Sequence, residues 1–302
     1  MHSMTVEDIK TIGIAGAGQM GRGIAHVCAT AGYPVLLYDL IPSSLTDSLA
    51  RIRTGLDRAV ERAGLTRQEA GNALALIRPT DKMDKLRDAQ LVIEAIPEDP
   101  ALKEELFSKL DRVCQARAVL ASNTSSISIT KLGVAAGRPA QVVGLHFMNP
   151  APVMHLVEVV QGLETSEETL NLALDLAKRL GKTPVVAKDM PGFIVNRILI
   201  PMINEAIFAL EKGVASIEDI DLAMTTGANH PVGPLSLADR IGLDTVLSIC
   251  EVLHRDLGDA KFRPCPLLRR YVEAGRLGRK TGRGFYVYEM KEQRREALSN
   301  KR

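Results

Sequence analysis

The sequence predicts an α/β fold, in which a doubly wound, mostly parallel sheet is followed by an all-α C-terminal domain. Three observations predict this. Short apolar runs alternate with amphipathic segments over the first two-thirds of the 302-residue chain, and a glycine-rich turn joins the first run to a helix. After "DMPGFIVNR" (189–197), only helical segments follow. Strands that alternate with helices form parallel sheets with helices on both faces.

The predicted strands are short apolar runs bounded by turn residues. They span residues 10–16, 33–39, 74–80, 89–97, 117–123, 141–147, 155–161 and 183–189. Helical spacing predicts helices at 19–31, 43–63, 101–116, 127–136 and 166–181. The last of these begins at "TSEE", which places a capping residue and acids at the positive end of the helix.

The composition of the chain changes near residue 190, where we expect the domain boundary. The first domain is predicted over 8–190, a helical domain over 191–290 and a basic tail over 291–302. Helices are expected at 193–212, 216–226, 235–256 and 264–274. The segment "GRLGRKTGRGFY" (275–286) has too many glycines for an exposed helix, which suggests close packing or tight turns of the backbone.

The composition is ordinary for a soluble enzyme, with 46% apolar and 25% charged residues. A formal net charge of +2 is too small to indicate a nucleic-acid partner. The four cysteines show no C-x-x-C spacing, so we expect no metal site and a reducing, cytoplasmic location. No apolar run reaches the roughly 18 residues that a membrane span needs, and "MHSMTVEDIK" resembles no targeting peptide.

The segment "GIAGAGQMG" (13–21) contains the pattern G-x-G-x-x-G between a predicted strand and a helix, and Asp39 ends the next strand. A dinucleotide-binding turn requires this context, because its glycines let the backbone approach a pyrophosphate at a helix N-terminus. The carboxylate of Asp39 can accept hydrogen bonds from ribose hydroxyls, and its charge repels a 2′-phosphate. We therefore predict a Rossmann-like domain that binds NAD, and a turn without a ligand is the less favoured alternative. The predicted site comprises Gly16, Gly18, Gln19, Met20, Gly21 and Asp39.

Two polar segments follow predicted strands at the edge where open α/β sheets bind ligands. The segment "EAIPEDPALK" (94–103) offers Glu98 and Lys103, and "SNTSS" (122–126) offers small polar groups. Because Ser and Asn also favour helix N-caps, "SNTSS" is either a cap for the next helix or a ligand site. Five polar residues in a row exceed what one cap needs, so we favour the ligand site.

The segment "VVGLHFMNPAPVMHLVEVV" (142–160) indicates two buried strands joined by a proline-containing turn, yet it carries His146 and Glu158. Carboxylates are rarely buried without a partner. If the strands pair across the turn, the two side chains meet on one face. A carboxylate fixes the tautomer of an imidazole and favours its protonated form, as a general acid/base requires. Beside NAD, this pair predicts oxidation of an alcohol, with a purely structural histidine as the alternative.

These segments, with "SNTSSISIT", "PGFIVNRILIPMINEA", "PVGPLSLADRIGLD" and "GRKTGRGFY", make the chain resemble the L-3-hydroxyacyl-CoA dehydrogenases over residues 9–288. Among them it is most similar to the bacterial 3-hydroxybutyryl-CoA dehydrogenase type. The resemblance implies NAD-dependent interconversion of a short-chain (S)-3-hydroxyacyl-CoA and its 3-oxoacyl-CoA. It also implies a homodimer formed through the helical domain.

The resemblance further implies roles for individual residues. His146 would be the catalytic base and Glu158 its partner, while Ser125 would contact the 3-oxygen of the substrate and Asn196 would bind near its carbonyl. The nicotinamide half of NAD would be lined by Glu98, Lys103, Ser125, Asn149 and Lys280. The family binds its CoA arm with basic side chains after the second strand. This chain has Arg51, Arg58 and Arg62 there on one helix face, which a solvated surface explains equally well.

Three other functions remain as alternatives. A Ser–His–Glu hydrolase could use Ser125, His146 and Glu158, but no G-x-S-x-G elbow surrounds Ser125 and a hydrolase needs no dinucleotide turn. A non-enzymatic NAD-binding protein is the second alternative. The third is a hydroxy-acid dehydrogenase of the same superfamily, of the L-gulonate type.

Overall fold

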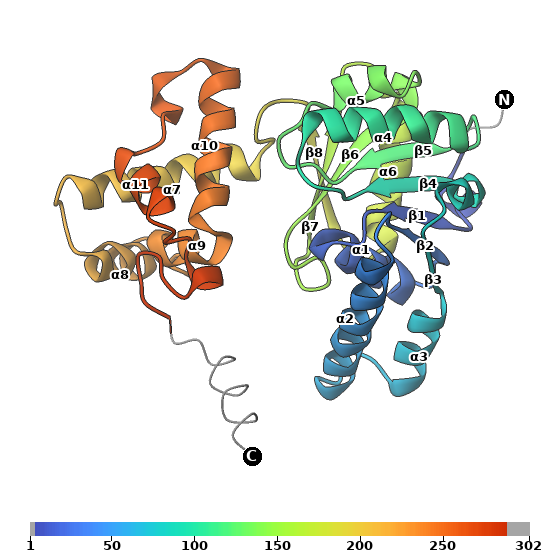
Figure 1. Cartoon of the computed structure of the whole chain (residues 1–302), viewed down its shortest axis with the longest axis horizontal. Coiled ribbons are helices and arrows are strands. Elements are labelled where there is room, and N and C mark those ends of the chain that lie inside the picture. The colour runs from blue at the N-terminus through green and yellow to red at the C-terminus, as the bar shows by residue number, and fades with distance from the viewer. Residues whose placement is uncertain (1–3, 289–302) are drawn as a thin grey trace. The chain divides into compact units, whose positions relative to one another are not determined.

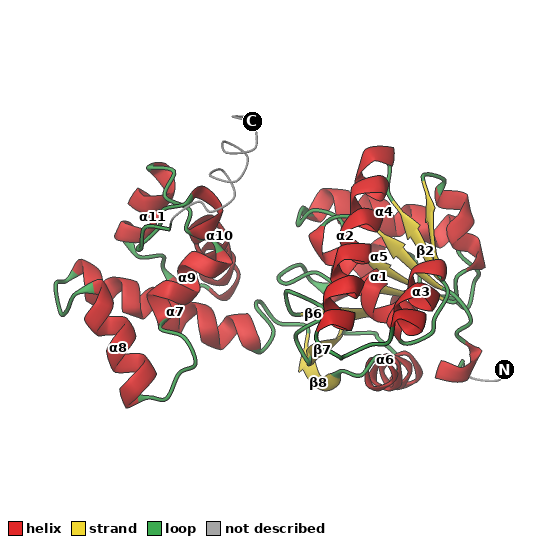
Figure 2. Ribbon diagram, turned by 90° about the horizontal axis from the view of Figure 1, so that it is seen from below, coloured by secondary structure: helices red, strands yellow, loops and turns green. Residues whose placement is uncertain are grey.

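The computed structural model describes residues 4–288 (Figures 1 and 2). The chain divides after Phe193 into two compact units. The first unit contains the sheet, and the second consists of helices and short turns. The predicted basic tail over 291–302 lies outside the described residues, as do the last two residues of the predicted helical domain.

One sheet of eight strands forms the centre of the first unit, in the order β3-β2-β1-β4-β5-β6-β7-β8. All neighbours are parallel except β6 and β7, so the predicted mostly parallel sheet is confirmed. The first six strands have the order found in dinucleotide-binding folds. The strands are β1 (Ile12–Ala15), β2 (Val35–Tyr38), β3 (Ile77–Thr80), β4 (Leu91–Glu94), β5 (Val119–Ser122), β6 (Val142–Phe147), β7 (Leu156–Gln161) and β8 (Thr183–Lys188).

Helices cover both faces of the sheet, because alternate residues of the buried strands point to opposite sides. One apolar core joins the sheet to α1 (Gln19–Thr30), α2 (Pro42–Glu61), α3 (Arg67–Ala75) and α6 (Glu167–Arg179). The core on the other face includes α4 (Pro100–Val113) and α5 (Ile129–Ala135). Ile14 and Ile93 belong to the first core, and Ala15 and Val92 to the second, so the sheet is covered on both sides.

The predicted strand 74–80 begins too early, because the helix α3 extends to Ala75. Its start is set by Thr66, whose hydroxyl accepts the amide hydrogen of Glu69 while the Glu69 carboxylate accepts the amide hydrogen of Thr66. This capping box stabilises a helix that the apolar pattern alone did not predict. Only the residues from Ile77 onward pair with β2.

The second unit contains α7 (Val195–Glu211), α8 (Ile217–Gly227), α9 (Pro234–Ile241), α10 (Leu243–Leu257) and α11 (Pro266–Glu273). The single helix predicted over 235–256 is wrong, since it is two helices separated by Gly242. That glycine has a φ of 101°, which is outside the helical region and unfavourable for other residues. The chain turns here and begins a second helix with its own apolar face.

The glycines of the segment 275–286 allow close packing, as the sequence suggested. The buried carboxylate of Asp239 accepts the amide hydrogens of Phe285 and Tyr286 and the hydroxyl hydrogen of Tyr288. A Cβ atom on Gly284 would overlap this carboxylate. None of the helices within residues 4–288 is long and apolar enough to cross a membrane.

Candidate active site

The glycine-rich turn joins β1 to α1 at the carboxyl edge of the sheet. Gly16 has a φ of 110°, and a Cβ atom there would overlap the backbone of Ala95. A Cβ atom on Gly21 would overlap the carbonyl oxygen of Gly16, so the helix can start this close to the strand only with glycine. Gly18 is exposed with open space around its Cα, and no side chain caps α1. These features fit the pyrophosphate of a dinucleotide, which helix N-termini bind through backbone N–H groups.

Asp39 follows β2 and faces the glycine turn. Its Oδ2 accepts the amide hydrogen of Ala17 at 2.7 Å, and its Oδ1 accepts that of Ile41 at 2.9 Å. A carboxylate has about four acceptor positions, so lone pairs remain for ribose hydroxyls. The partly buried Asp39 therefore stabilises the turn and still fits the predicted ribose contact.

His146 and Glu158 lie opposite each other in the antiparallel pair β6–β7. Nδ1 of His146 is 2.6 Å from Oε2 of Glu158, whose side chain is completely buried. The ring of Phe193 lies against the imidazole, with 5.7 Å between the ring centroids. The carboxylate orients the ring through Nδ1, which leaves Nε2 available for another hydrogen bond. The strand pairing expected from the sequence therefore brings these two side chains together.

A second buried charged group, which the sequence analysis missed, lies at the end of β4. The side chain of Glu94 is completely buried and is 2.5 Å from Nζ of Lys103, itself 1% exposed. Burial raises the pKa of Glu94, against the opposing effect of the Lys103 ammonium and the hydrogen bond from Ser122. The available signal was the same as for Glu158: a Glu inside an apolar run, here "AQLVIEAIP" (89–97).

Glu98 joins the two polar segments that the sequence singled out. Its Oε1 accepts hydrogen bonds from Thr124, Ser125 and Ser126, and its Oε2 is 3.3 Å from Nζ of Lys103. Burial opposes ionisation, but the Lys103 ammonium and these hydrogen bonds hold the pKa of Glu98 below its ordinary value. The N-cap of α5 is Ser128, so the polar residues 122–126 are not the cap of that helix.

Asn149 lies in the turn between β6 and β7. Its Oδ1 accepts a hydrogen from Nε2 of Gln19 at 3.0 Å, which connects this turn to the glycine turn. Nζ of Lys182 donates to the carbonyl oxygens of Ala151 and Met154 in the same turn. Two residues that were predicted to bind the cofactor, 130 positions apart, are therefore in contact.

The other predicted residues lie on α2, at its C-cap or in the second unit. Arg51, Arg58 and Arg62 are exposed, and Arg51 pairs with Asp47 one helical turn earlier. Asn196 is in the first turn of α7. Nζ of Lys280 is 2.6 Å from Oδ2 of Asp244. The roles of these residues remain predictions.

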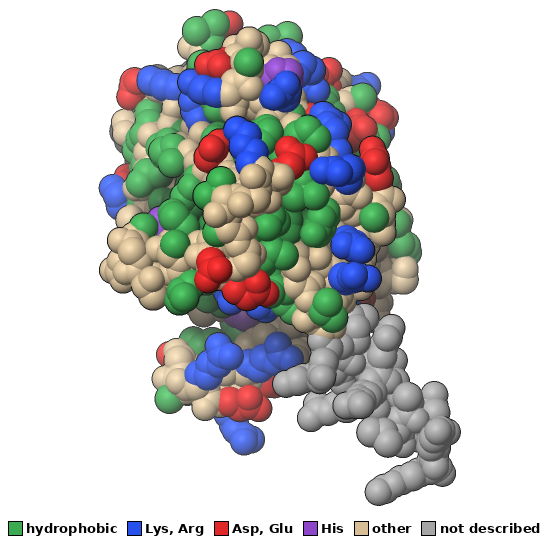
Figure 3. Space-filling model, turned by 90° about the vertical axis from the view of Figure 1, so that its left-hand side faces the viewer, with side chains coloured by type: hydrophobic (Ala, Val, Ile, Leu, Met, Phe, Trp, Pro, Cys, Tyr) green, Lys and Arg blue, Asp and Glu red, His purple; other side chains and the backbone are tan. Residues whose placement is uncertain are grey.

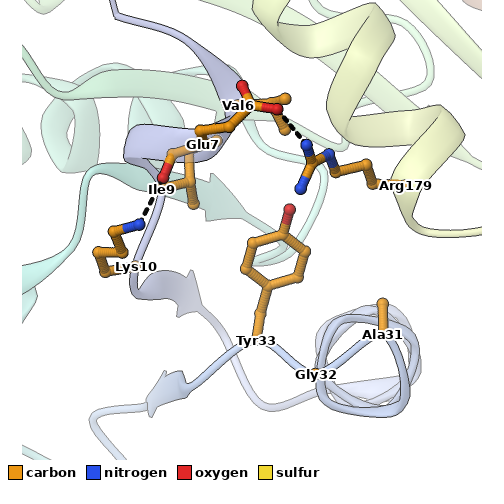
Figure 4. A pocket seen from close by; sticks show the side chains of 8 residues that line it. All are labelled: Val6, Glu7, Ile9, Lys10, Ala31, Gly32, Tyr33 and Arg179. Atoms are coloured by element: carbon orange, nitrogen blue, oxygen red, sulfur yellow. Dashed lines mark hydrogen bonds and ion pairs between the residues drawn. The ribbon is translucent and has the colours of Figure 1, made fainter.

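A cavity of about 480 Å³ is found elsewhere in the first unit (Figure 4). It lies at the starts of β1 and β2, not at their carboxyl ends, and Arg179 in its wall pairs with Glu7. Lys10 donates to the backbone carbonyl oxygen of Glu7. The residues that line this cavity are Val6, Glu7, Ile9, Lys10, Ala31, Gly32, Tyr33 and Arg179.

No group of side chains able to hold a metal ion occurs among residues 4–288.

A dinucleotide turn and a buried imidazole–carboxylate pair on one sheet define the class of protein, an NAD-dependent oxidoreductase. Comparison with known families is more specific. The model of the 3-hydroxyacyl-CoA dehydrogenase NAD-binding domain matches residues 11–190, and that of the 3-hydroxyacyl-CoA dehydrogenase C-terminal domain matches residues 192–288. The chain belongs to the 3-hydroxyacyl-CoA dehydrogenase family, as the resemblance predicted.

Individual relatives cover almost the whole chain. It is 53% identical to a probable 3-hydroxybutyryl-CoA dehydrogenase of Bacillus subtilis over 284 residues, which are 94% of this chain and 99% of that protein. It is 51% identical to a 3-hydroxybutyryl-CoA dehydrogenase of Bradyrhizobium diazoefficiens, covering 93% and 96% of the two chains. The crystal structure of (S)-3-hydroxybutyryl-CoA dehydrogenase from Ralstonia eutropha superposes with a TM-score of 0.90 at 48% identity, covering 93% and 99%.

Proposed function

We propose that this enzyme interconverts short-chain (S)-3-hydroxyacyl-CoA and 3-oxoacyl-CoA, with 3-hydroxybutyryl-CoA and acetoacetyl-CoA as the substrate pair. The observation that carries the proposal is the buried His146–Glu158 pair on a sheet whose first turn fits NAD. The names of the relatives support the choice of substrate.

In this proposal His146 is the general acid/base. Glu158 accepts a hydrogen bond from Nδ1, so Nε2 is the atom that takes the proton of the 3-hydroxyl group during oxidation. In reduction the same nitrogen returns the proton to the 3-oxygen. The buried carboxylate stabilises the imidazolium that is present once Nε2 has taken the proton. Bound NAD supplies the acceptor for the hydride that leaves C3.

Other residues bind and orient the reactants. The hydroxyl of Ser125 is 3.3 Å from Glu98, the longest of the five hydrogen bonds to Oε1, so it is the one most easily turned toward the 3-oxygen. Gly16, Gly18 and Gly21 hold the pyrophosphate, and Asp39 selects NAD over NADP. Asn149 and Lys280 contact the nicotinamide half of NAD, Asn196 binds near the substrate carbonyl, and the exposed face of α2 carrying Arg51, Arg58 and Arg62 binds the CoA arm.

A homodimer formed through the helical unit is part of the proposal. Large apolar side chains are exposed on this unit, including Ile198, Val214 and Leu222 at 68%, 72% and 58%. Figure 3 shows hydrophobic side chains gathered on the face of this unit that it draws. Light scattering at micromolar concentration should give twice the mass of one chain.

The four buried thiols form no disulfide, which supports the proposed reducing, cytoplasmic location.

The test follows NADH absorbance at neutral pH with acetoacetyl-CoA, with NADPH and with free acetoacetate. Rapid oxidation of NADH with the CoA ester alone is the expected result. Turnover of a free hydroxy or oxo acid instead would favour the L-gulonate type of dehydrogenase. NADH binding without turnover on any of these compounds would contradict the proposal and favour a non-enzymatic role.

The hydrolase is disfavoured by the structure. The hydroxyl of Ser125 lies against Glu98, and among the described residues the hydrogen-bond partner of His146 is Glu158, not a serine. A burst of acyl product released without NAD would be needed to restore this alternative.

A further inference from the structure

Glu94 is a buried ionisable group that the proposed reaction does not use. It ends β4 and is paired in register with Ser122, the last residue of β5. Burying a carboxylate is unfavourable unless hydrogen bonds and a counter-charge compensate. Its Oε1 accepts hydrogens from Lys103 Nζ at 2.5 Å and from the amide of Ile96 at 2.7 Å. Its Oε2 accepts the hydroxyl hydrogen of Ser122 at 2.6 Å.

Lys103 links Glu94 to Glu98, because its ammonium contacts both carboxylates. Its ammonium has three hydrogens, and three acceptors surround it: Oε1 of Glu94, the carbonyl oxygen of Ile96 at 3.2 Å and Oε2 of Glu98 at 3.3 Å. The side chain is 1% exposed. An ammonium that makes two hydrogen bonds and a further ion pair to the protein, with almost no exposed surface, holds these protein groups in place.

Glu98 in turn holds the turn that carries Ser125. Its Oε1 accepts the amide hydrogens of Ser125 and Ser126 at 2.9 and 3.1 Å, and the hydroxyl hydrogen of Thr124 at 2.5 Å. The side chain of Glu98 is 37% exposed, and Lys103 is the buried cation beside its other oxygen, Oε2, at 3.3 Å. The chain of contacts runs from Glu94 through Lys103 and Glu98 to Ser125.

We propose that Glu94 is a positioning residue: its carboxylate fixes Lys103, which fixes Glu98, which places the Ser125 hydroxyl for the 3-oxygen of the substrate. The role of Ser125 rests on the proposed function, whereas the connection from Glu94 to the turn 122–126 does not.

The test is Glu94→Gln, which keeps the size of the side chain and removes its charge. We expect kcat/KM for acetoacetyl-CoA to fall about tenfold, because small displacements of a positioning group are costly for a reaction. The loss should appear in kcat, with the dissociation constant of NADH, followed by its fluorescence, changed by less than about threefold, since the glycine turn and Asp39 are untouched. A lower melting temperature with unchanged kinetic constants would show a purely structural role and overturn the proposal.

Asp189→Asn is the matched control. Its carboxylate accepts hydrogens from Ser128, Ile129 and Thr130, so it also anchors the β5–α5 segment, but beyond Ser125. We expect this variant to lose stability while kcat/KM stays within about twofold, as for substitutions that leave the reacting geometry intact. An equal loss of kcat in both variants would contradict a specific role for Glu94.

Amide hydrogen exchange gives a readout that does not depend on activity. Glu94→Gln should accelerate exchange at Ser125 and Ser126, and Asp189→Asn at Ile129 and Thr130. If the unsubstituted enzyme does not reduce acetoacetyl-CoA, the proposed function fails, while exchange still decides whether Glu94 holds the turn. If Glu94→Gln does not fold, Ser122→Ala decides, with a smaller change expected in the same direction. No change in that variant would overturn the proposal.

Discussion

Glu94 and Glu158 are both completely buried carboxylates of the same sheet, and each lies beside a basic nitrogen, at 2.5 Å for Lys103 and 2.6 Å for His146. The two pairs differ in the hydrogen-bonding capacity that the basic side chain retains. The ammonium of Lys103 makes two hydrogen bonds and a second ion pair to the protein, whereas the imidazole of His146 contacts Glu158 through Nδ1 alone and leaves Nε2 available. We therefore propose that a buried carboxylate serves either to position other groups or to support proton transfer, according to the basic side chain that it holds.

The largest effect should come from breaking the His146–Glu158 pair, which we propose transfers the proton. His146→Gln removes the general acid/base, and we expect kcat to fall about 10³-fold, within the range typical of such groups. Steady-state kinetics with NADH and acetoacetyl-CoA measure the effect, and near-normal turnover would show that the assigned mechanism is wrong.

The next effect tests Glu158 as the partner that orients the imidazole. Glu158→Gln should lower kcat by about 10²-fold, since the ring loses its charged partner but keeps its place. The double variant His146→Gln/Glu158→Gln should be no slower than His146→Gln alone, because residues that act as a unit are not additive. Additive losses would mean that the two residues act independently.

Breaking the Glu94–Lys103 ion pair should lower the stability of the protein. Lys103→Met leaves buried carboxylate charge without its counter-ion, and we expect the free energy of unfolding to drop by about 3 kcal/mol. Adding Glu94→Gln should recover about 1 kcal/mol or more, because it removes the unpaired charge. Urea unfolding measures both variants. A double variant less stable than Lys103→Met would contradict the ion pair.

Asp39 is a third carboxylate at this edge of the sheet, but it is only partly buried. It accepts hydrogen bonds from two backbone amides, whereas Glu94 and Glu158 each contact a basic side chain. Asp39→Ser should raise KM for NADH about tenfold, the value of one hydrogen bond to a charged group. Activity with NADPH should rise, because the charge that repels a 2′-phosphate is gone. Unchanged preference for NADH would show that another residue selects the cofactor.

His26 is the control for an imidazole without such a carboxylate. It is 9% exposed, and burial, with the Lys182 ammonium nearby, lowers its pKa below the ordinary value of 6.5. The unfolded state then binds a proton more readily than the folded state, so stability is full above pH 6.5 and is lost as the pH falls through the lower folded pKa. His26→Gln should make this decline shallower. Urea unfolding between pH 7 and 5 measures this smallest effect, and an unchanged slope would contradict it.

The elements of the sheet were predictable because their signals are local. Apolar runs identified all eight strands, and the glycine spacing identified the turn after β1. Errors occurred where another local feature overrode the apolar pattern. Capping at Thr66 produced α3, and the positive φ of Gly242 divided one predicted helix into two. At the site, the pair His146–Glu158 was predictable because both residues lie in strands joined by a short turn.

Glu94 shows why the rest was missed. It carries the same signal as Glu158, a carboxylate in an apolar run, but its side-chain partners lie in β5 and α4 and not in the other strand of a hairpin. The contact of Gln19 with Asn149 likewise joins residues 130 positions apart. Such pairs depend on the order and register of strands, which no window of the sequence contains.

The sequence by itself determined the class of fold, the dinucleotide turn and the imidazole–carboxylate pair. Each of these depends on backbone conformation or on a period of a few residues, and such rules act between near neighbours. Only the tertiary structure decided which buried charges meet: that Lys103 is held between Glu94 and Glu98, and that Glu98 holds the Ser125 turn. A buried charge is stable only beside its partners, and which partners are near is set by the packing of distant segments.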